Sequence, residues 1–159
     1  DCQGKSLFIV GDGQLRSEMQ DFTEEHGLDS VRFFGFRDRN EVKDLYATAD
    51  LLVLPSSRET WGIVVNEAMC YGLPVIVSSQ VGAALDLVQD GKNGYIYPSG
   101  DVEALARLPQ QFVELTKEDR RLMELRSLGL IKRWVKRDLA QSLDKYFDFI
   151  YAHQLPPKI

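Results

Sequence analysis

Cysteine is scarce in this sequence of 159 residues, which holds only Cys2 and Cys70. Two cysteines are too few for the disulfide framework of a small secreted scaffold, so we exclude that class. Cys70 falls inside a predicted helix, where we expect a reduced thiol packed in the core. This cysteine usage is typical of a cytoplasmic protein.

Long hydrophobic runs are missing as well. No apolar stretch approaches the roughly 18 residues that a helix needs to cross a bilayer. Residues 1–5 lack the charged and apolar regions of a signal peptide. We therefore expect a chain that is soluble or that contacts a membrane only peripherally.

Positive charge is not in excess, and clusters of metal ligands are absent. The formal net charge is -5, with acids and bases interspersed, so the sequence has no basic footprint and we predict no nucleic-acid partner. No Asp-x-Asp pair occurs, and the two histidines, His26 and His153, stand outside any ligand-spaced cluster. The sequence therefore predicts no metal site.

The most informative stretch is residues 55–78, which read PSSRETWGIVVNEAMCYGLPVIVS. An apolar strand is predicted before it, over residues 49–54, and a second over residues 75–77. Apolar residues at helical spacing lie between them, and Gly72 and Pro74 mark the end of that helix. A strand, a loop, a helix and another apolar strand are typical of a parallel sheet that is covered on both faces.

Polar residues of this unit fall where such sheets bind ligands. Glu59 lies in the loop after the first strand, Gly62 opens the helix, and Glu67 lies on the helix. Ligands of doubly wound sheets bind beyond the carboxyl ends of the strands, and bare helix amides attract phosphate. A carboxylate in that position suits a ligand with hydroxyl groups, such as a sugar. Spacing alone favours the simpler alternative, in which Glu59 caps the helix and Glu67 lies on a solvated face.

The segments that precede this stretch repeat the strand and helix pattern. A strand over residues 6–10 leads into Gly11-Asp12-Gly13 and a helix, and a strand over residues 31–34 leads into a second helix with Asn40 as its N-cap. A dinucleotide fingerprint would need a third glycine at the position of Arg16, so NAD binding is not favoured.

The segments that follow the central stretch are a strand and two helices. The strand spans residues 95–97, and Asp101 is predicted to cap a helix with Leu105 on its apolar face. The chain reads helical from Lys117 onward, with Trp134 among basic residues. This basic helix either rests on an anionic membrane or packs Trp134 on the core, and we favour packing. The cations concerned are Lys132, Arg133, Lys136 and Arg137.

The string PSSRETWGIVVNEAMCYGLPVIVSS resembles the signature of the retaining, nucleotide-sugar-dependent glycosyltransferases of GT-B fold, the glycosyl transferases group 1 of family 4 type. Their C-terminal domain carries P-S-x-x-E-x-x-G, then E-A-M, then G-x-P-V-I. Two positions depart from the pattern, because Thr60 and Ala83 stand where relatives have glycine. The resemblance implies an α/β fold, a Rossmann-like doubly wound parallel sheet over residues 1–150, followed by a C-terminal tail over residues 151–159.

The same resemblance implies site roles. Glu59 would be the catalytic residue, next to the donor sugar, with conceivable roles as positioner or as general base. Glu67 would accept hydrogen bonds from ribose, and Phe36 and Arg37 would line the nucleotide base, although Arg37 reads equally well as an exposed loop charge. The other residues expected at the donor are Gly11 and Gly13 near the diphosphate, and Thr60, Trp61, Gly62 and Ile63 at the helix start.

The function that the resemblance implies is transfer of a sugar from a UDP- or GDP-linked donor to an acceptor hydroxyl with retention. Polysaccharide, lipopolysaccharide or glycolipid biosynthesis in the cytoplasm, at the inner face of the membrane, would be its setting. We expect no cofactor, because the nucleotide sugar is the substrate.

Two parts that relatives possess have no counterpart in the sequence. One is the first strand of this domain with its basic residues, and the other is the N-terminal acceptor-binding domain. We therefore expect this chain alone to bind rather than to catalyse. A sugar-nucleotide epimerase of the same fold and a non-catalytic nucleotide-sugar binding module remain as alternatives.

Overall fold

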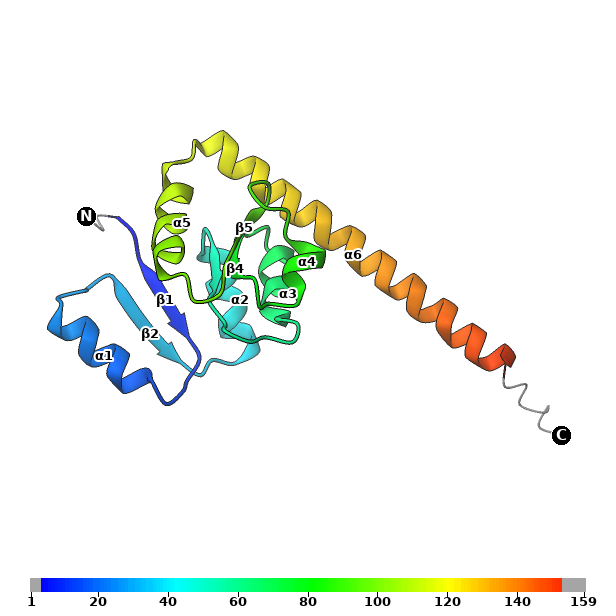
Figure 1. The fold of residues 1–159 in the computed structure, drawn as a ribbon, viewed down its shortest axis with the longest axis horizontal. Coiled ribbons are helices and arrows are strands. Elements are labelled where there is room, and N and C mark those ends of the chain that lie inside the picture. The colour runs from blue at the N-terminus through cyan, green and yellow to red at the C-terminus, as the bar shows by residue number, and fades with distance from the viewer. Residues whose placement is uncertain (1–3, 153–159) are drawn as a thin grey trace. The chain divides into compact units, whose positions relative to one another are not determined.

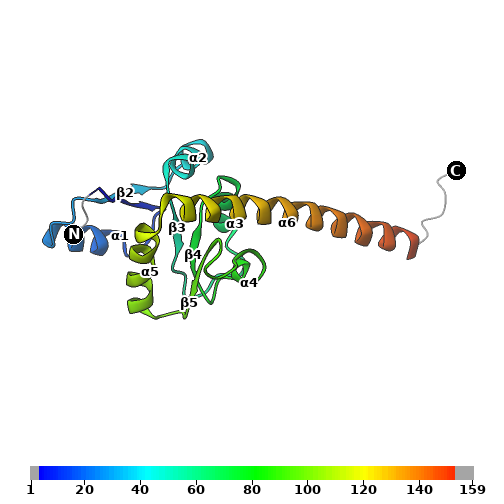
Figure 2. The same cartoon turned by 90° about the horizontal axis from the view of Figure 1, so that it is seen from above.

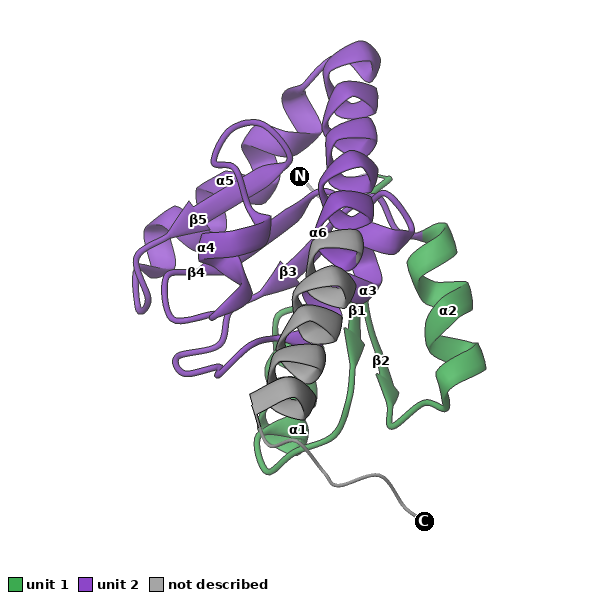
Figure 3. Cartoon of the chain, turned by 90° about the vertical axis from the view of Figure 1, so that its right-hand side faces the viewer, with its two compact units in different colours: residues 1–48 green, residues 49–159 purple. Residues whose placement is uncertain are grey.

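The computed structural model describes residues 4–152, with side chains up to Val135. Strands and helices alternate along most of the chain (Figure 1). The chain divides into two compact units, residues 1–48 and residues 49–159 (Figure 3). Each unit is built on strands that pair in parallel, as an α/β fold requires.

The first unit holds a two-stranded parallel sheet and two helices. Leu7 lies opposite Val31, and the register shifts after Ile9. Both predicted strands and the helix between them are confirmed. The elements are β1 (Leu7–Val10), α1 (Arg16–Glu25), β2 (Val31–Gly35) and α2 (Arg39–Thr48).

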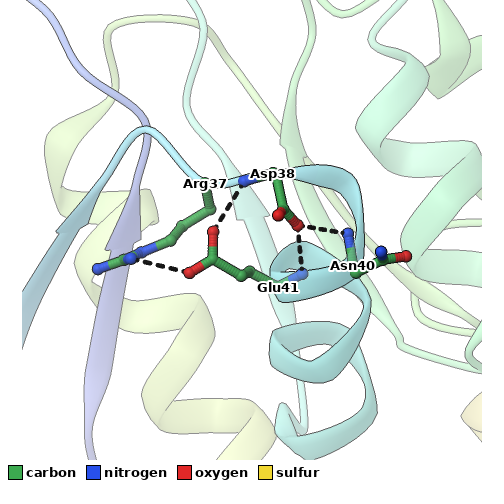
Figure 4. A network of polar contacts seen from close by, with 4 residues as sticks. All are labelled: Arg37, Asp38, Asn40 and Glu41. Carbon is green, nitrogen blue, oxygen red and sulfur yellow. Dashed lines mark hydrogen bonds and ion pairs between the residues drawn. The ribbon is translucent and has the colours of Figure 1, made fainter.

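The start of α2 differs from the prediction that Asn40 caps it. Oδ1 of Asp38 accepts hydrogen bonds from the amides of Asn40 (2.8 Å) and Glu41 (2.9 Å), so Asp38 is the cap (Figure 4). Oε2 of Glu41 accepts in return from the amide of Asp38, at 3.0 Å. The two acids satisfy one another's amides as a capping box, and Asn40 lies inside the first turn.

The second unit holds a three-stranded parallel sheet in the order β3-β4-β5. Both apolar strands of the central stretch, the helix between them and the strand after them are confirmed. Gly72 follows the end of that helix with φ +82°, a conformation that glycine adopts without strain. The elements are β3 (Leu52–Leu54), α3 (Ile63–Cys70), β4 (Val75–Ser78), α4 (Ala83–Leu87), β5 (Gly94–Tyr97), α5 (Val102–Glu114) and α6 (Lys117–Ala152).

Helices cover both faces of this second sheet, with α5 on one side and α3 and α4 on the other (Figure 2). On the α5 side, Ile76 of β4 belongs to a buried cluster with Tyr95 and Phe112. Because side chains alternate along a strand, Val75 and Val77 face the opposite side, and both are fully buried. Strand β4 is therefore buried on both faces, which explains its unbroken apolar sequence.

The cap of α5 and the packing of Leu105 agree with prediction. The side chain of Asp101 accepts a hydrogen bond from the amide of Ala104 at 2.8 Å, and Leu105 packs against the buried cluster. Two other features differ. Helix α4 was not predicted, and Cys70, expected in the core, is an exposed free thiol at the end of α3.

Helix α6 begins at Lys117, as predicted, and packs along α3. None of the described helices is both long and apolar enough to cross a membrane. The predictions for Lys136 and Arg137 concern side chains outside the described residues. The C-terminal tail was predicted to begin at residue 151, but α6 continues to Ala152, and the rest of that tail lies outside the described residues.

Candidate functional site

Two loops of the second unit meet at the carboxyl ends of β3 and β4. The amide of Glu59 donates to the carbonyl of Gln80 at 3.1 Å, and the amide of Gly82 donates to the carbonyl of Glu59 at 3.0 Å. Glu59 and Val81 therefore form a short parallel bridge beyond the sheet. The backbone of Glu59 is fixed on both sides, at the edge where parallel sheets bind ligands.

The start of α3 carries no side-chain cap. Gly62 occupies the N-cap position with φ +90°, and a Cβ there would lie 3.0 Å from Cγ1 of Val81 and 3.1 Å from Cδ2 of Leu54. Within the described part of the chain, the amides of Trp61, Gly62 and Ile63 donate to no acceptor. These amides, at the positive end of the helix dipole, form an arrangement that attracts anions.

The two candidate acids lie at different distances from this turn. Cγ of Glu59 lies 3.3 Å from the position of a Cβ on Gly62, so this side chain packs against the start of α3. Glu67 is half-buried and lies in the second turn of the helix. Glu67 and Cys70 are three residues apart on α3, and partial burial together with the charge of Glu67 raises the pKa of the Cys70 thiol.

The loop after β4 approaches the loop after β3 more closely than any side chain would allow. A Cβ on Gly82 would lie 2.1 Å from the carbonyl oxygen of Thr60, which is a backbone atom and cannot rotate away. The next amide, that of Ala83, donates to the carbonyl of Trp61 at 2.8 Å. Glycine is thus required at position 82, whereas alanine at 83 leaves the contact intact.

Sequence reasoning missed two polar side chains that support these loops. Oγ of Ser78, which is buried at the end of β4, donates to the carbonyl of Ser56 and accepts from the amide of Gln80. Oδ1 of Asn66, 7% exposed on α3, accepts from Nε1 of Trp61 at 2.8 Å. The sequence did offer a signal for them, because a polar residue at the end of an apolar strand or on a buried helix face needs a hydrogen-bond partner.

In the first unit, the predicted turn at Gly11 meets Gly35 at the carboxyl ends of β1 and β2. The amide of Gly11 donates to the carbonyl of Gly35 at 2.8 Å, and Gly11 has φ +118°. The amide of Gly13 donates to the side chain of Asp12. Phe36 is 83% exposed, so its ring is accessible for stacking.

The guanidinium of Arg37 is engaged within the first unit. Its Nη1 lies 2.9 Å from Oε1 of Glu41, as the dashed line in Figure 4 marks. The group also lies over the ring of Phe34, with 5.7 Å between Cζ and the ring centroid. Its buried Nε has no acceptor among the described residues. Arg37 is therefore more than a solvated loop charge, although its position alone assigns it no ligand.

The predicted site residues divide between the two units. Gly11, Gly13, Phe36 and Arg37 lie in the first, and Glu59, the turn of residues 60–63 and Glu67 lie in the second. Among the described residues, no group of three or more histidine, cysteine or acidic side chains could hold a metal ion.

A model of the family described as Glycosyl transferases group 1 matches residues 4–125. A lipopolysaccharide core biosynthesis glycosyltransferase of Rhizobium meliloti is 32% identical over 111 residues, which are 69% of this chain and 32% of the relative. A GDP-mannose-dependent alpha-mannosyltransferase of Mycobacterium tuberculosis is 35% identical over 115 residues, 72% of this chain and 28% of the relative.

Among solved structures, the Anabaena protein HepE in complex with UDP is similar, with a TM-score of 0.75 and 25% identity. The match covers 89% of this chain and 41% of HepE. The chain spans about a third or less of the length of the curated relatives it matches.

Proposed function

Because the chain belongs to the glycosyl transferases group 1 family, we propose that it is the donor-binding domain of a retaining glycosyltransferase. The parent enzyme would transfer a sugar from a nucleotide diphosphate sugar to an acceptor hydroxyl. The observation that carries this proposal is the uncapped start of α3, where the amides of Trp61, Gly62 and Ile63 have no acceptor among the described residues.

These amides suit the chemistry of the reaction. Negative charge develops on the leaving diphosphate as the bond to the sugar breaks. N–H groups that are already fixed in direction stabilise that charge without reorganising, and Gly62 and Gly82 fix this turn by close packing. We assign the diphosphate to the amides of residues 61–63.

The two acids take different roles in this proposal. Glu59 packs against the same turn and has its backbone fixed by Gln80 and Gly82, so we assign it to the hydroxyl groups of the donor sugar, next to the reacting centre. Glu67, farther along α3, is assigned to the ribose hydroxyls. Acceptor binding is assigned to a second domain outside the described residues.

The donor base stays open between uridine and guanosine. A relative named for GDP-mannose and a structure solved with UDP both resemble this chain. The setting that we propose is envelope polysaccharide, lipopolysaccharide or glycolipid synthesis, supported by the relative from lipopolysaccharide core biosynthesis.

We also propose that the protein works in the cytoplasm and contacts the inner face of the membrane peripherally. A shallow groove of about 500 Å³ is lined by Lys92, Arg126 and Arg133, together with Gln89, Gly129 and Leu130. None of the three cations forms an ion pair within the described residues. Sedimentation with vesicles of anionic or neutral lipid tests this contact, and a glutamate at each of the three positions should abolish any preference for anionic lipid.

A thermal melt of the chain against UDP, GDP, ADP and NAD tests the donor assignment. A ligand at 100 times its dissociation constant adds about 2.7 kcal/mol to the free energy of unfolding. We expect UDP or GDP alone to raise the melting temperature, and Glu67→Ala to remove the effect. No shift with either nucleotide would contradict the proposal.

A sugar-nucleotide epimerase of the same fold is the competing activity. An epimerase would convert the donor in the absence of acceptor, whereas a transferase would need the acceptor to release transferred product. Assays of the full-length enzyme with and without acceptor separate the two.

A further inference from the structure

The two tryptophans of the chain contact each other, although one lies in the loop before α3 and the other on α6. The rings of Trp61 and Trp134 have centroids 5.5 Å apart and planes tilted by 31°. Nε1 of Trp61 donates to Oδ1 of the buried Asn66 at 2.8 Å. The indole of Trp61 is therefore held at its edge by α3 and at its face by α6.

The backbone of Trp61 is tied at the same time. Its carbonyl accepts from the amide of Ala83 at 2.8 Å, which joins it to the start of α4. Its own amide is the remaining polar group, and it donates to no acceptor within the described residues. Asn66, Trp134 and Ala83 thus hold Trp61 by three separate contacts, while its own N–H points to no acceptor at the uncapped turn.

Helix α6 packs along α3 and reaches this turn, because its Leu128 lies near the end of α3 and its Trp134 near the start. Near the end of α3, a Cβ on Gly72 would lie 3.4 Å from Cγ of Leu128. Trp134 comes six residues later, about 9 Å farther along α6, and reaches the loop at the other end of α3. Between them Ile131, 3% exposed, anchors α6 to the core.

We propose that Trp134 is a positioning residue for the donor-binding turn, acting through the ring of Trp61 to hold the amides of residues 61–63 in their binding geometry. The inference rests on the proposed function. A turn that is already ordered binds its ligand more tightly, because none of the binding free energy is spent on ordering the loop. An aromatic pair contributes about 0.5–1.5 kcal/mol beyond its buried area, so we expect Trp134→Leu to weaken nucleotide affinity roughly 3- to 10-fold.

The affinity test compares four chains, each titrated with UDP and with GDP at a temperature where all are folded. Trp134→Leu removes the ring contact, and Trp134→Phe should restore most of the affinity because it keeps an aromatic face. Ile131→Ala is the matched control, since it removes a buried anchor of α6 and leaves both indole rings in place. The inference is overturned if Ile131→Ala weakens binding as much as Trp134→Leu, or if neither changes it.

A readout without ligand separates this inference from the proposed function. The amide of Ala83 donates to the carbonyl of Trp61, so its hydrogen exchange reports whether that residue is held. We expect Trp134→Leu to speed exchange at Ala83 more than Ile131→Ala does. Failure of every nucleotide to bind would sink the proposed function, while equal exchange at Ala83 in the two variants would sink the positioning role of Trp134.

Discussion

The amide of Gly82 donates to the carbonyl of Glu59 across 3.0 Å, and this bond joins the loop after β4 to the loop after β3. The contact is possible because residue 82 has no side chain. It orients Glu59 through its backbone, so the carboxylate remains available for a ligand. The proposed site thus depends on Gly82, which contributes only a backbone amide.

Gly82→Ala should damage both folding and nucleotide binding. The added Cβ would lie 2.1 Å from the carbonyl oxygen of Thr60, and only a shift of the backbone can relieve that overlap. Overpacking of this kind costs about 1–3 kcal/mol. We expect a lower urea midpoint and a loss of nucleotide affinity of tenfold or more by calorimetric titration. Unchanged affinity in the folded variant would contradict the close packing of the two loops.

Gly129→Ala on α6 should have the opposite effect on stability. A Cβ there would meet nothing within 4 Å, and Gly129 lacks the left-handed φ that would strain alanine. Alanine is favoured over glycine inside a helix by up to about 1 kcal/mol. Urea unfolding should therefore show an increase of that order, with nucleotide affinity unchanged. A decrease in stability would mean that α6 packs differently near residue 129.

Glu59 and Glu67 should fail in different ways. In the full-length enzyme, Glu59→Ala should mainly lower kcat, because this acid packs against the turn to which we assign the diphosphate. Glu67→Ala should mainly raise KM for the donor and weaken nucleotide binding. Steady-state kinetics of both variants check this, with Asp86→Ala on the neighbouring helix α4 as the control. Small and equal effects from both substitutions would refute the assignment.

Much of the fold follows from the sequence because it is encoded locally. Strands β3 and β4 are apolar runs bounded by turn residues, and α3 has apolar residues at helical spacing before Gly72. Helix α4 escaped prediction because its five residues are too few to show a helical period. At α2, both Asp38 and Asn40 are good caps, and the reciprocal bond from Glu41 decided in favour of Asp38.

The support of the candidate site could not be predicted in the same way. Glu59, Gly62 and Glu67 lie within one short stretch of the sequence, where they form a motif that can be read locally. The contact of Trp61 with Trp134 joins segments far apart in the chain, and only packing reveals it. Cys70 was assigned to the core by its helical position, but the helix end turns it toward solvent. The degree of burial of Cys70 and the partner of Trp61 depend on tertiary contacts, which local sequence patterns do not encode.

The capping box of α2 should make the first unit sensitive to acid. Hydrogen bonds from the amides of Glu41 and Asn40, and the charge of Arg37, hold the pKa of Asp38 below its usual value of 3.8. A carboxyl whose pKa is lowered by folding stabilises the fold above its unfolded pKa. That contribution is lost as the pH falls through the lower, folded value. Melting temperatures should therefore decline below about pH 4, in part through this group.

Asp38→Asn isolates that contribution, because asparagine is also a good helix cap but does not titrate in this range. Between about pH 6 and pH 3, the melting temperature of this variant should fall less steeply than that of the natural chain. Glu41→Gln is the companion variant, since it retains an acceptor for the Asp38 amide while it removes the ion pair with Arg37. A carbon-13 titration of the Asp38 carboxyl gives the direct measurement. A folded-state pKa at or above 3.8 would mean that the two amides do not bond the charged carboxylate in solution.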